Sequence, residues 1–457
     1  MKTPPLQPRA PLRFGTDGVR GAAGQWPLTE EGALLVGQAL ADSLRAEQPE
    51  ATVVIGMDTR RSSPWLARWL ESGLRRQGVH VLRAGVLPSA GLSLAVVASR
   101  ADAGVMITAS HNPASDNGIK LMGPDGRKWV GQEALEARLD QALEEAPPPA
   151  PIRGSARDLE DPAGPWRAAM PRLDLSGLRL LLDCAHGAAA PHAPALLQSL
   201  GAALHLRGCD PDGDNINAAV GALHPPSAAE VAAAGCALAL CLDGDADRLL
   251  LVDPERGVLD GDDALFLLAA EGQGPVVGTV MSNGGLDAAL PGRLLRSPVG
   301  DRSVAAMMLE SGARFGAEPS GHILFSDGPP TGDGVYAALR LLAVGATEGR
   351  PRLPLLSGDS PSAPSEVGTG TTRRRWSRWP LFTRDVRFSG ARRPLEGLAS
   401  IHAAQAAGNR VVVRYSGTEP LLRILVEGPA SQSGDGAPDA GHGPAAWVER
   451  IAQEFQS

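Results

Sequence analysis

Five short apolar runs, each followed at once by a polar loop and separated from the next by longer helix-forming stretches, constrain the fold of this 457-residue chain. The runs show little alternation between apolar and polar residues, which is typical of strands buried on both faces. Such a sheet needs helices on each side, so the pattern predicts an α/β fold. The runs with their loops span residues 51–60, 103–113, 178–187, 237–248 and 275–283.

The chain is long enough for three or four domains of roughly 100 to 200 residues each. Stretches rich in Pro, Gly and Ser at 147–151 and 358–372 predict two joints, and a softer joint is expected at 253–257. Two strands around a tight loop at 410–428 and a closing helix at 445–455 predict a smaller α+β domain at the end, after three α/β domains. The predicted domains span residues 1–150, 151–254, 255–365 and 366–457.

Composition excludes several classes of protein. Hydrophobic residues make up 43% and charged residues 21%, which is typical of a soluble globular chain. No apolar run approaches the ~18 residues that span a bilayer, and the net charge of −8 gives no field that attracts nucleic acid. The first residues lack the apolar stretch of a secretory signal, so a cytoplasmic location is expected. The only lysines, Lys2, Lys120 and Lys128, do not follow glycine, which excludes a P-loop.

The segment DGDADR, residues 243–248, places three carboxylates at every second position after an apolar strand. Asp243, Asp245 and Asp247 repel one another unless a cation neutralises them. An all-oxygen set suits a hard ion, and the ligands are too few for a calcium cage, which favours Mg²⁺. The alternative is an acidic turn capped by Arg248, which is common for two aspartates and less so for three. The spacing favours a metal site.

The segment TASHNP, residues 108–113, also follows an apolar strand, at the sheet edge where ligands of open α/β sheets bind. The Ser110 hydroxyl is a poor nucleophile at neutral pH without help, which His111, Lys120 or a metal would supply. Taken alone, the loop is better explained as a Ser/Asn-rich turn in which Pro113 begins a helix. No G-x-S-x-G elbow supports a hydrolase.

Three further loops carry polar groups that suit a sugar phosphate. AEPSGH offers Glu318, Ser320 and His322 for sugar hydroxyls, and FGTDGVRG near the N-terminus contributes Arg20. RYSGTEP with the following LLR combines guanidinium groups, hydroxyls and backbone N–H donors, a set that suits phosphate. Each loop alone is a weak signal, because Ser-Gly turns are common between strands.

Taken in order, FGTDGVRG, TASHNP, DGDADR, EPSGH and RYSGTEP resemble the motifs of the α-D-phosphohexomutase superfamily, and specifically of its phosphoglucosamine mutase branch. The resemblance covers the chain from Arg13 to about Gly428. It implies four domains around one cleft, three related α/β domains and a smaller C-terminal α+β domain. It also implies that Ser110 carries a phosphoryl group, and that this phosphate and the three aspartates hold one Mg²⁺.

The resemblance assigns roles to the remaining candidates. Glu318 and Ser320 match residues that bind sugar hydroxyls, and Arg248 lies where positive charge is needed. Lys120, His322, Arg20 and His111 are the candidates for proton transfer and charge stabilisation. The loop that grips the non-reacting phosphate of the substrate matches Arg414, Ser416, Gly417, Thr418 and Arg423.

The implied reaction interconverts glucosamine 6-phosphate and glucosamine 1-phosphate and feeds amino-sugar nucleotide synthesis. Phospho-Ser110 donates to the hexosamine phosphate, glucosamine 1,6-bisphosphate serves as intermediate and activator, and Ser110 recovers the other phosphoryl group. Such an isomerase depends on positioning and on neutralising oxygen charge. The expected partner is the small hexosamine phosphate, with no nucleic acid and no membrane, and the chain is expected to act as a monomer or homodimer.

Departures from the family pattern bear on efficiency and substrate choice. Pro298 stands where the family usually has a lysine, so either one cationic contact to the cleft phosphate is missing or Arg296 or Arg302 replaces it. Pro319 in the sugar loop has no N–H to donate, and Tyr415 stands where the branch has lysine. Residues 358–408 match poorly.

Three alternatives follow. A phosphomannomutase or phosphoglucomutase would use the same mechanism, because sugar choice rests on few contacts; Ala317 and the order Ser416-Gly417-Thr418 favour glucosamine. A catalytically impaired paralogue that binds sugar phosphate would explain Pro298, but it would not need the complete set of motif residues. A phosphatase with an aspartate nucleophile would carry its phosphate on Asp243 instead of Ser110.

Overall fold

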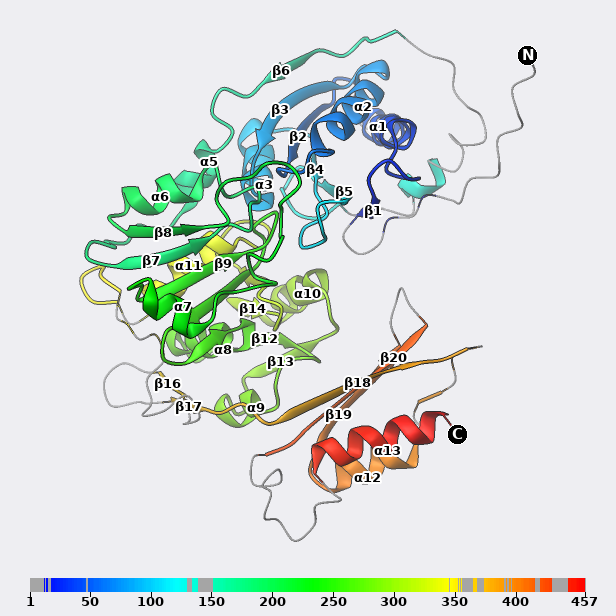
Figure 1. Cartoon of the computed structure of the whole chain (residues 1–457). Helices are drawn as coiled ribbons and strands as arrows, with labels where there is room; N and C mark the ends of the chain where they lie inside the picture. Colours follow the sequence, from blue (N-terminus) through cyan, green and yellow to red (C-terminus); the bar gives the residue numbers. More distant parts are fainter. Residues whose placement is uncertain are drawn as a thin grey trace. The chain divides into compact units, whose positions relative to one another are not determined.

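The computed structural model divides into two units, residues 1–261 with 320–355 and residues 262–319 with 356–457 (Figure 1). The structure describes residues 12, 14, 18–46, 48–129, 134–138, 151–344, 346–351, 353, 355, 365–367, 374–389, 392, 394–395, 397–415, 420–429 and 443–456. The joints expected at 147–151 and 358–372 lie almost wholly outside these residues. Among the described helices, none has the length and apolar character needed to cross a membrane.

The first sheet of the first unit has six strands in the order β1-β5-β4-β2-β3-β6. Strands β4, β2, β3 and β6 run parallel, and β5 and β1 continue the sheet antiparallel. The strands are β1 (Val19–Ala22), β2 (Thr52–Met57), β3 (His80–Val86), β4 (Ala103–Ile107), β5 (Asp116–Met122) and β6 (Ala156–Asp158). The helices are α1 (Glu30–Arg45), α2 (Ser63–Arg76), α3 (Ser89–Ser99) and α5 (Gly164–Ala169).

Alternate residues of the central strands lie in two separate cores. Val53 and Ile55 of β2 pack in the core formed with α1 and α2, whereas Val54 packs in the core formed with α3. Because side chains alternate across a strand, a strand that is apolar throughout fills both cores. This confirms the prediction that the run at 51–60 is a strand buried on both faces.

The second sheet of the first unit has the order β11-β10-β9-β7-β8. Strand β7 pairs in parallel with β8 and with β9, and β10 and β11 follow antiparallel. The turn expected to form a joint at 253–257 connects β10 to β11 in a hairpin. The elements are β7 (Arg179–Asp183), α6 (Ala193–Ser199), β8 (Ala203–Arg207), α7 (Ala228–Ala233), β9 (Leu238–Leu242), β10 (Leu249–Asp253) and β11 (Gly257–Leu259). The first unit also contains β15 (Ile323–Phe325), which is not a strand of this sheet, and α11 (Gly334–Ala343).

The second unit contains a small parallel sheet and a C-terminal antiparallel sheet. Strand β12 pairs in parallel with β13 and β14, and β20 lies between β18 and β19 with α12 and α13 packed on one face (Figure 1). The closing helix and the two strands predicted around a tight loop are confirmed as α13, β19 and β20. The elements are α8 (Gly261–Leu268), η1 (Ala269–Glu271), β12 (Val276–Thr279), α9 (Gly285–Ala289), β13 (Leu294–Ser297), α10 (Asp301–Ser311), β14 (Phe315–Ala317), β16 (Ser365–Val367), β17 (Arg374–Trp376), β18 (Leu381–Arg387), α12 (Ala399–Ala406), β19 (Arg410–Tyr415), β20 (Leu421–Glu427) and α13 (Pro444–Gln456).

Helices α1 and α2 pack backbone against backbone where Gly37 meets Gly73. A Cβ on Gly37 would lie 2.2 Å from the carbonyl oxygen of Leu70, and that oxygen belongs to rigid helix backbone. We therefore expect Gly37→Ala to lower the free energy of unfolding of the first unit by about 1–3 kcal/mol, the usual cost of overpacking. Thermal unfolding checks this, with Gly21→Ala as the control because its added Cβ meets nothing within 4 Å. Equal melting temperatures for the two variants would contradict it.

Candidate active site

Ser110 follows strand β4 and lies at the edge of the first sheet. Its backbone has a φ of 51°, in the left-handed region that side chains with a Cβ rarely adopt, and its side chain is buried at 1% exposure. The hydroxyl donates a hydrogen bond of 2.7 Å to Oδ2 of Asp243 and lies 3.3 Å from Nδ1 of His111. The two motifs that the sequence singled out, TASHNP and DGDADR, therefore meet at Ser110.

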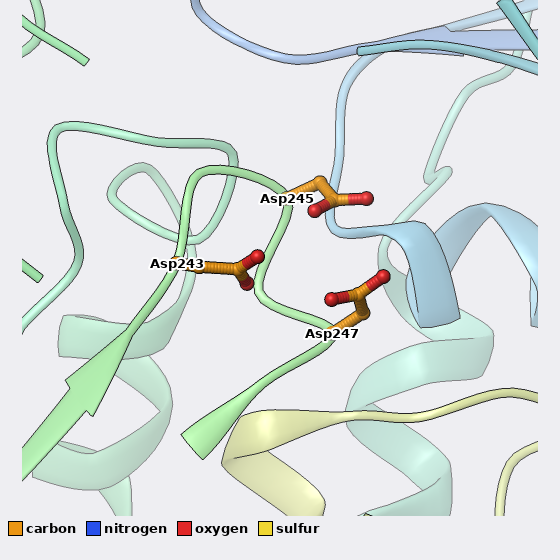
Figure 2. Close-up of side chains that lie close together, drawn as sticks. All are labelled: Asp243, Asp245 and Asp247. Atoms are coloured by element: carbon orange, nitrogen blue, oxygen red, sulfur yellow. The ribbon is translucent and has the colours of Figure 1, made fainter. Parts of the chain in front are cut away.

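Asp243, Asp245 and Asp247 lie on the tight turn that connects β9 to β10, and their carboxylates point toward one another (Figure 2). One oxygen from each lies within 4.8 Å of the others, and the three residues are at most 8% exposed. Alternation of Asp with Gly244 and Ala246 lets the turn present all three on one side. Ala246 takes the left-handed conformation, with a φ of 59°.

The carboxylates differ in their electrostatic surroundings. Burial and the negative charges of Asp247 and Asp245 raise the pKa of Asp243 to about 7. Burial alone would raise the pKa of Asp247 as well, but Lys120, His322 and Arg248 outweigh burial and hold that pKa well below its ordinary value. The buried Oδ1 of Asp245 accepts no hydrogen bond. Converging carboxylates, one of them with an unsatisfied buried oxygen, fit a hard cation such as Mg²⁺.

Positive side chains surround this cluster within the first unit. The Lys120 ammonium donates to Oδ2 of Asp245 at 2.6 Å and to Oδ2 of Asp247 at 3.1 Å. Burial and the nearby positive charges of Arg248 and Arg20 lower the pKa of His111 to about 4, so its imidazole is neutral at pH 7. These two guanidinium groups thus place positive charge near the residue that follows Ser110.

The C-terminal part of the first unit contributes His322. Its Nδ1 lies 3.7 Å from Oδ1 of Asp247, and its backbone bridges to that of Arg248 beside the metal turn. Ser320, two residues earlier, is exposed to solvent. The first unit therefore brings together most of the predicted residues, namely Ser110, His111, Lys120, Arg20, Asp243, Asp245, Asp247, Arg248 and His322.

The second unit carries the other predicted residues. Oε1 of Glu318 accepts a hydrogen bond of 2.9 Å from the Gly300 N–H. Arg414 of β19 lies directly opposite Arg423 of β20, and burial together with the charge of Arg423 lowers the pKa of Arg414. Two cationic groups held side by side favour an anion between them. Ser416, Gly417 and Thr418, predicted in the same loop, lie outside the described residues.

Arg296, one of the two residues considered as a replacement at Pro298, is bonded to acceptors of its own unit. The Arg296 guanidinium donates to the carbonyl oxygens of Thr279 and Ser282 at 3.0 and 2.6 Å, and to Asp287 at 2.6 Å. These contacts tie Arg296 to the loop after β12, because its fixed donors are directed at protein acceptors. Arg302, the other candidate, is exposed in the first turn of α10.

Sequence reasoning missed Ser89, Arg60 and Asn217, which hold the two reactive loops. Ser89 begins α3 and donates its hydroxyl to Asp245, and its N–H donates to the Asp245 carbonyl at 3.0 Å. Arg60 and Asn217 both donate to the carbonyl oxygen of Ser110, each at 2.9 Å. Arg60 and Ser89 follow strands β2 and β3, so the rule that ligands gather at the carboxyl ends of parallel strands would have pointed to them.

Four family models together match most of the chain. They describe phosphoglucomutase/phosphomannomutase alpha/beta/alpha domain I at residues 11–146, domain II at 167–257, domain III at 260–358 and the C-terminal domain at 396–435.

Curated relatives match across nearly the full length of the chain. A phosphoglucosamine mutase of Anaeromyxobacter sp. (strain Fw109-5) is 41% identical over 446 residues, covering 92% of each chain. One of Rhodospirillum rubrum is 42% identical over 442 residues, covering 91% of this chain and 94% of the relative.

Solved structures share the fold at lower identity. A phosphoglucomutase/phosphomannomutase family protein of Burkholderia thailandensis aligns with a TM-score of 0.71 at 23% identity, covering 96% of each chain. N-acetylphosphoglucosamine mutase of Aspergillus fumigatus, solved with GlcNAc-6P and magnesium, aligns with a TM-score of 0.61 at 18% identity, covering 97% of this chain and 95% of that one.

Proposed function

The chain belongs to the phosphoglucomutase/phosphomannomutase family, and from that membership we propose how its residues act as a phosphoglucosamine mutase. The enzyme interconverts glucosamine 6-phosphate and glucosamine 1-phosphate, as its curated relatives of about 41% identity do by name. It is an isomerase that moves a phosphoryl group within one sugar. The observation that carries the mechanism is the 2.7 Å contact between the Ser110 hydroxyl and Asp243, inside a buried cluster of three carboxylates.

Ser110 is the phosphoryl carrier. In the first step the bond between its Oγ and phosphorus breaks while the 1-hydroxyl oxygen of glucosamine 6-phosphate bonds to phosphorus. The sugar hydroxyl proton passes to a base, and the departing Ser110 Oγ takes up a proton. Glucosamine 1,6-bisphosphate results. In the second step the Ser110 Oγ bonds to the phosphorus on the sugar's 6-oxygen while the bond between that oxygen and phosphorus breaks. The Ser110 proton passes to a base and the 6-oxygen takes up a proton, which leaves glucosamine 1-phosphate and restores the phosphoserine. The same residues serve both steps because the transferred group always lies at Ser110.

Asp243, Asp245 and Asp247, with Ser110, would hold one Mg²⁺. When bound, the ion would neutralise charge on the phosphoryl oxygens. The unsatisfied Oδ1 of Asp245 supports this assignment, and so does the magnesium complex named for the fungal relative. Lys120 also neutralises negative charge here, because its ammonium already contacts two of the carboxylates.

Proton transfer and charge stabilisation fall to the remaining groups. His322 is the proposed base and acid, since its imidazole lies beside Asp247, which orients it and stabilises its charged form. His111, neutral and 3.3 Å from the Ser110 oxygen, positions that oxygen. Arg20 and Arg248 stabilise the charge that develops on the transferred phosphoryl group.

The sugar and its second phosphate are bound by residues named from the family motifs. Glu318 and Ser320 bind the sugar hydroxyls, and the Gly300 N–H fixes the Glu318 carboxylate for this role. Arg414, Ser416, Gly417, Thr418 and Arg423 bind the phosphate that does not react. The juxtaposition of Arg414 and Arg423 on neighbouring strands supports this part of the proposal.

We also propose a division into domains at residues 1–150, 151–254, 255–365 and 366–457, with the β10–β11 hairpin spanning the second limit. Sugar phosphates are charged metabolites that do not cross membranes unaided, so we propose a cytoplasmic enzyme. It acts as a monomer or homodimer, with glucosamine 1,6-bisphosphate as activator.

The test is a comparison of substrates on the purified chain with Mg²⁺ and a catalytic amount of glucosamine 1,6-bisphosphate. We expect the highest kcat/KM with glucosamine 6-phosphate, lower values with glucose and mannose phosphates, and one phosphate on Ser110 by intact mass and peptide mapping. A preference for glucose or mannose phosphate would keep the mechanism and change the substrate. Phosphorylated, folded protein that turns over none of them would support the impaired paralogue, and phosphate on Asp243 would support the phosphatase.

A further inference from the structure

Arg60 is a buried arginine whose guanidinium donates hydrogen bonds to backbone carbonyl groups of the Ser110 loop. Its side chain is 1% exposed, and Nε pairs with Asp58 at 2.8 Å. Nη2 donates to the carbonyl oxygens of Ser110 at 2.9 Å and Asn112 at 2.8 Å. Nη1 donates to the carbonyl oxygens of Pro113 and, at 2.9 Å, Asp116.

These contacts use all five N–H donors of the guanidinium. Arg60 therefore has no donor left for a substrate phosphate, although it contacts the carbonyl group of Ser110. Its charge is also matched by the equally buried carboxylate of Asp58. Arg60 acts by positioning: its rigid, planar guanidinium group fixes four carbonyl groups of one loop relative to one another.

Asn217 holds the same loop from the second sheet's side of the unit. Its Nδ2 donates to the carbonyl oxygens of Ser110 at 2.9 Å and Asn112 at 3.0 Å, the two that Nη2 of Arg60 also contacts. Asn217 is itself held at a φ of 59°, with its N–H bonded to the Ala185 carbonyl at 2.8 Å. The Ser110 carbonyl thus accepts two hydrogen bonds, one from each of these side chains.

The metal turn packs against that carbonyl as well. A Cβ on Gly244 would lie 2.5 Å from the Ser110 oxygen and 3.0 Å from Nδ2 of Asn217. A shift of the Ser110 backbone would therefore also disturb the turn that carries Asp243 and Asp245. The left-handed conformation of Ser110 is energetically costly and persists only when the surroundings over-determine it.

We propose that Arg60 and Asn217 are positioning residues that hold the Ser110 hydroxyl in line for phosphoryl transfer by clamping its carbonyl group. This inference rests on the proposed function, because it assigns Ser110 the role of phosphoryl carrier. It predicts that the clamp sets the rate of transfer and leaves binding of the sugar phosphate nearly unchanged. A misplacement of about 1 Å costs roughly 100-fold in rate.

The test uses Asn217→Gly and Arg60→Lys. Glycine removes the clamping amide while tolerating the positive φ, and lysine keeps the charge beside Asp58 while removing the fork. We expect kcat, and the single-turnover rate from phospho-Ser110, to fall roughly tenfold for Asn217→Gly and roughly 100-fold for Arg60→Lys. KM is expected to stay within threefold of the wild-type value.

Matched controls lie in the same loops. Ala219→Gly adds glycine at another left-handed position, with a φ of 55°, and Arg61→Lys changes the exposed neighbouring arginine that pairs with Asp214. Both are expected to keep wild-type kcat. If Arg60→Lys fails to fold, as judged by circular dichroism, Asn217→Gly still decides the question.

Folded Asn217→Gly with wild-type kcat would overturn the clamp, and so would a rise in KM at unchanged kcat, which would indicate substrate binding. Failure of the wild-type chain to take up phosphate on Ser110 would instead overturn the proposed function, and the clamp with it. The two failures are therefore distinguished by the wild-type measurement alone.

Discussion

Ser110→Ala is expected to abolish mutase turnover and to leave the chain without covalent phosphate. The hydroxyl is the atom that forms and breaks the bond to phosphorus, and it donates to Asp243 of the carboxylate cluster. Loss of a covalent nucleophile that acts with its neighbours as a unit lowers kcat by roughly 10⁶-fold in well-studied enzymes. Rate measurement together with intact mass after incubation with glucosamine 1,6-bisphosphate checks both parts.

Ser115→Ala is the matched control. Ser115 lies five residues later in the same loop, is exposed, and its hydroxyl is 3.5 Å from Asp116, away from the carboxylate cluster. It should keep wild-type turnover and one phosphate per chain. Mutase activity retained by Ser110→Ala would contradict the phosphoserine mechanism, and phosphate retained by that variant would move the carrier to another residue.

Local patterns predicted the strands and the two reactive loops. The runs at 103–107 and 238–242 are uniformly apolar, and both are buried strands that lead into the loops carrying Ser110 and Asp243. The two strands belong to different sheets, so the meeting of their loops was expected only from the resemblance to the phosphohexomutase motifs. The metal site was predicted from the charge and spacing of the three aspartates, because carboxylates this close repel one another unless a cation neutralises them.

Contacts between distant segments were not predictable in the same way. Lys120 reaches Asp245 across 125 positions of sequence, and Asn217 reaches Ser110 across 107. No periodicity connects such pairs, because they depend on how two separate sheets pack within the unit. Arg60 was overlooked for a related reason: its partners are backbone carbonyls, which any sequence supplies.

Turn residues also carry less information than strand residues. Asp253 to Gly257 contains the Pro, Glu and Gly that are typical of a joint, and the structure has a hairpin turn there between β10 and β11. The same residue types form turns within a sheet and at domain limits, and here Gly257 adopts a φ of 82° in the hairpin turn. Sequence alone does not separate the two cases.

Asp243→Asn is expected to abolish Mg²⁺ binding and nearly all activity. The metal-free protein is expected to become more stable against unfolding. Burial and the charges of Asp247 and Asp245 already raise the pKa of Asp243 to about 7, so ionised Asp243 is unfavourable without a cation. A neutral amide relieves that repulsion. The Asp243 carboxylate accepts hydrogen bonds from the Arg248 N–H and the Ser110 hydroxyl, and an amide can still accept from that N–H and contact that hydroxyl. Several kcal/mol of lost charge stabilisation corresponds to roughly 10²- to 10⁴-fold in kcat/KM.

Thermal unfolding with and without Mg²⁺ separates a metal site from a structural acidic turn. A ligand at 100 times its Kd stabilises the folded state by about 2.7 kcal/mol, so Mg²⁺ should raise the melting temperature of the wild type but not of Asp243→Asn. Asp253→Asn is the matched control: this buried carboxylate accepts from the Glu255 and Arg256 N–H groups, which an amide oxygen can also do. It should respond to Mg²⁺ as the wild type does. If the three aspartates instead formed a turn that needs no cation, Mg²⁺ would leave the wild-type melting temperature unchanged. The folded chain would then bind Mg²⁺ no more tightly than the unfolded chain does.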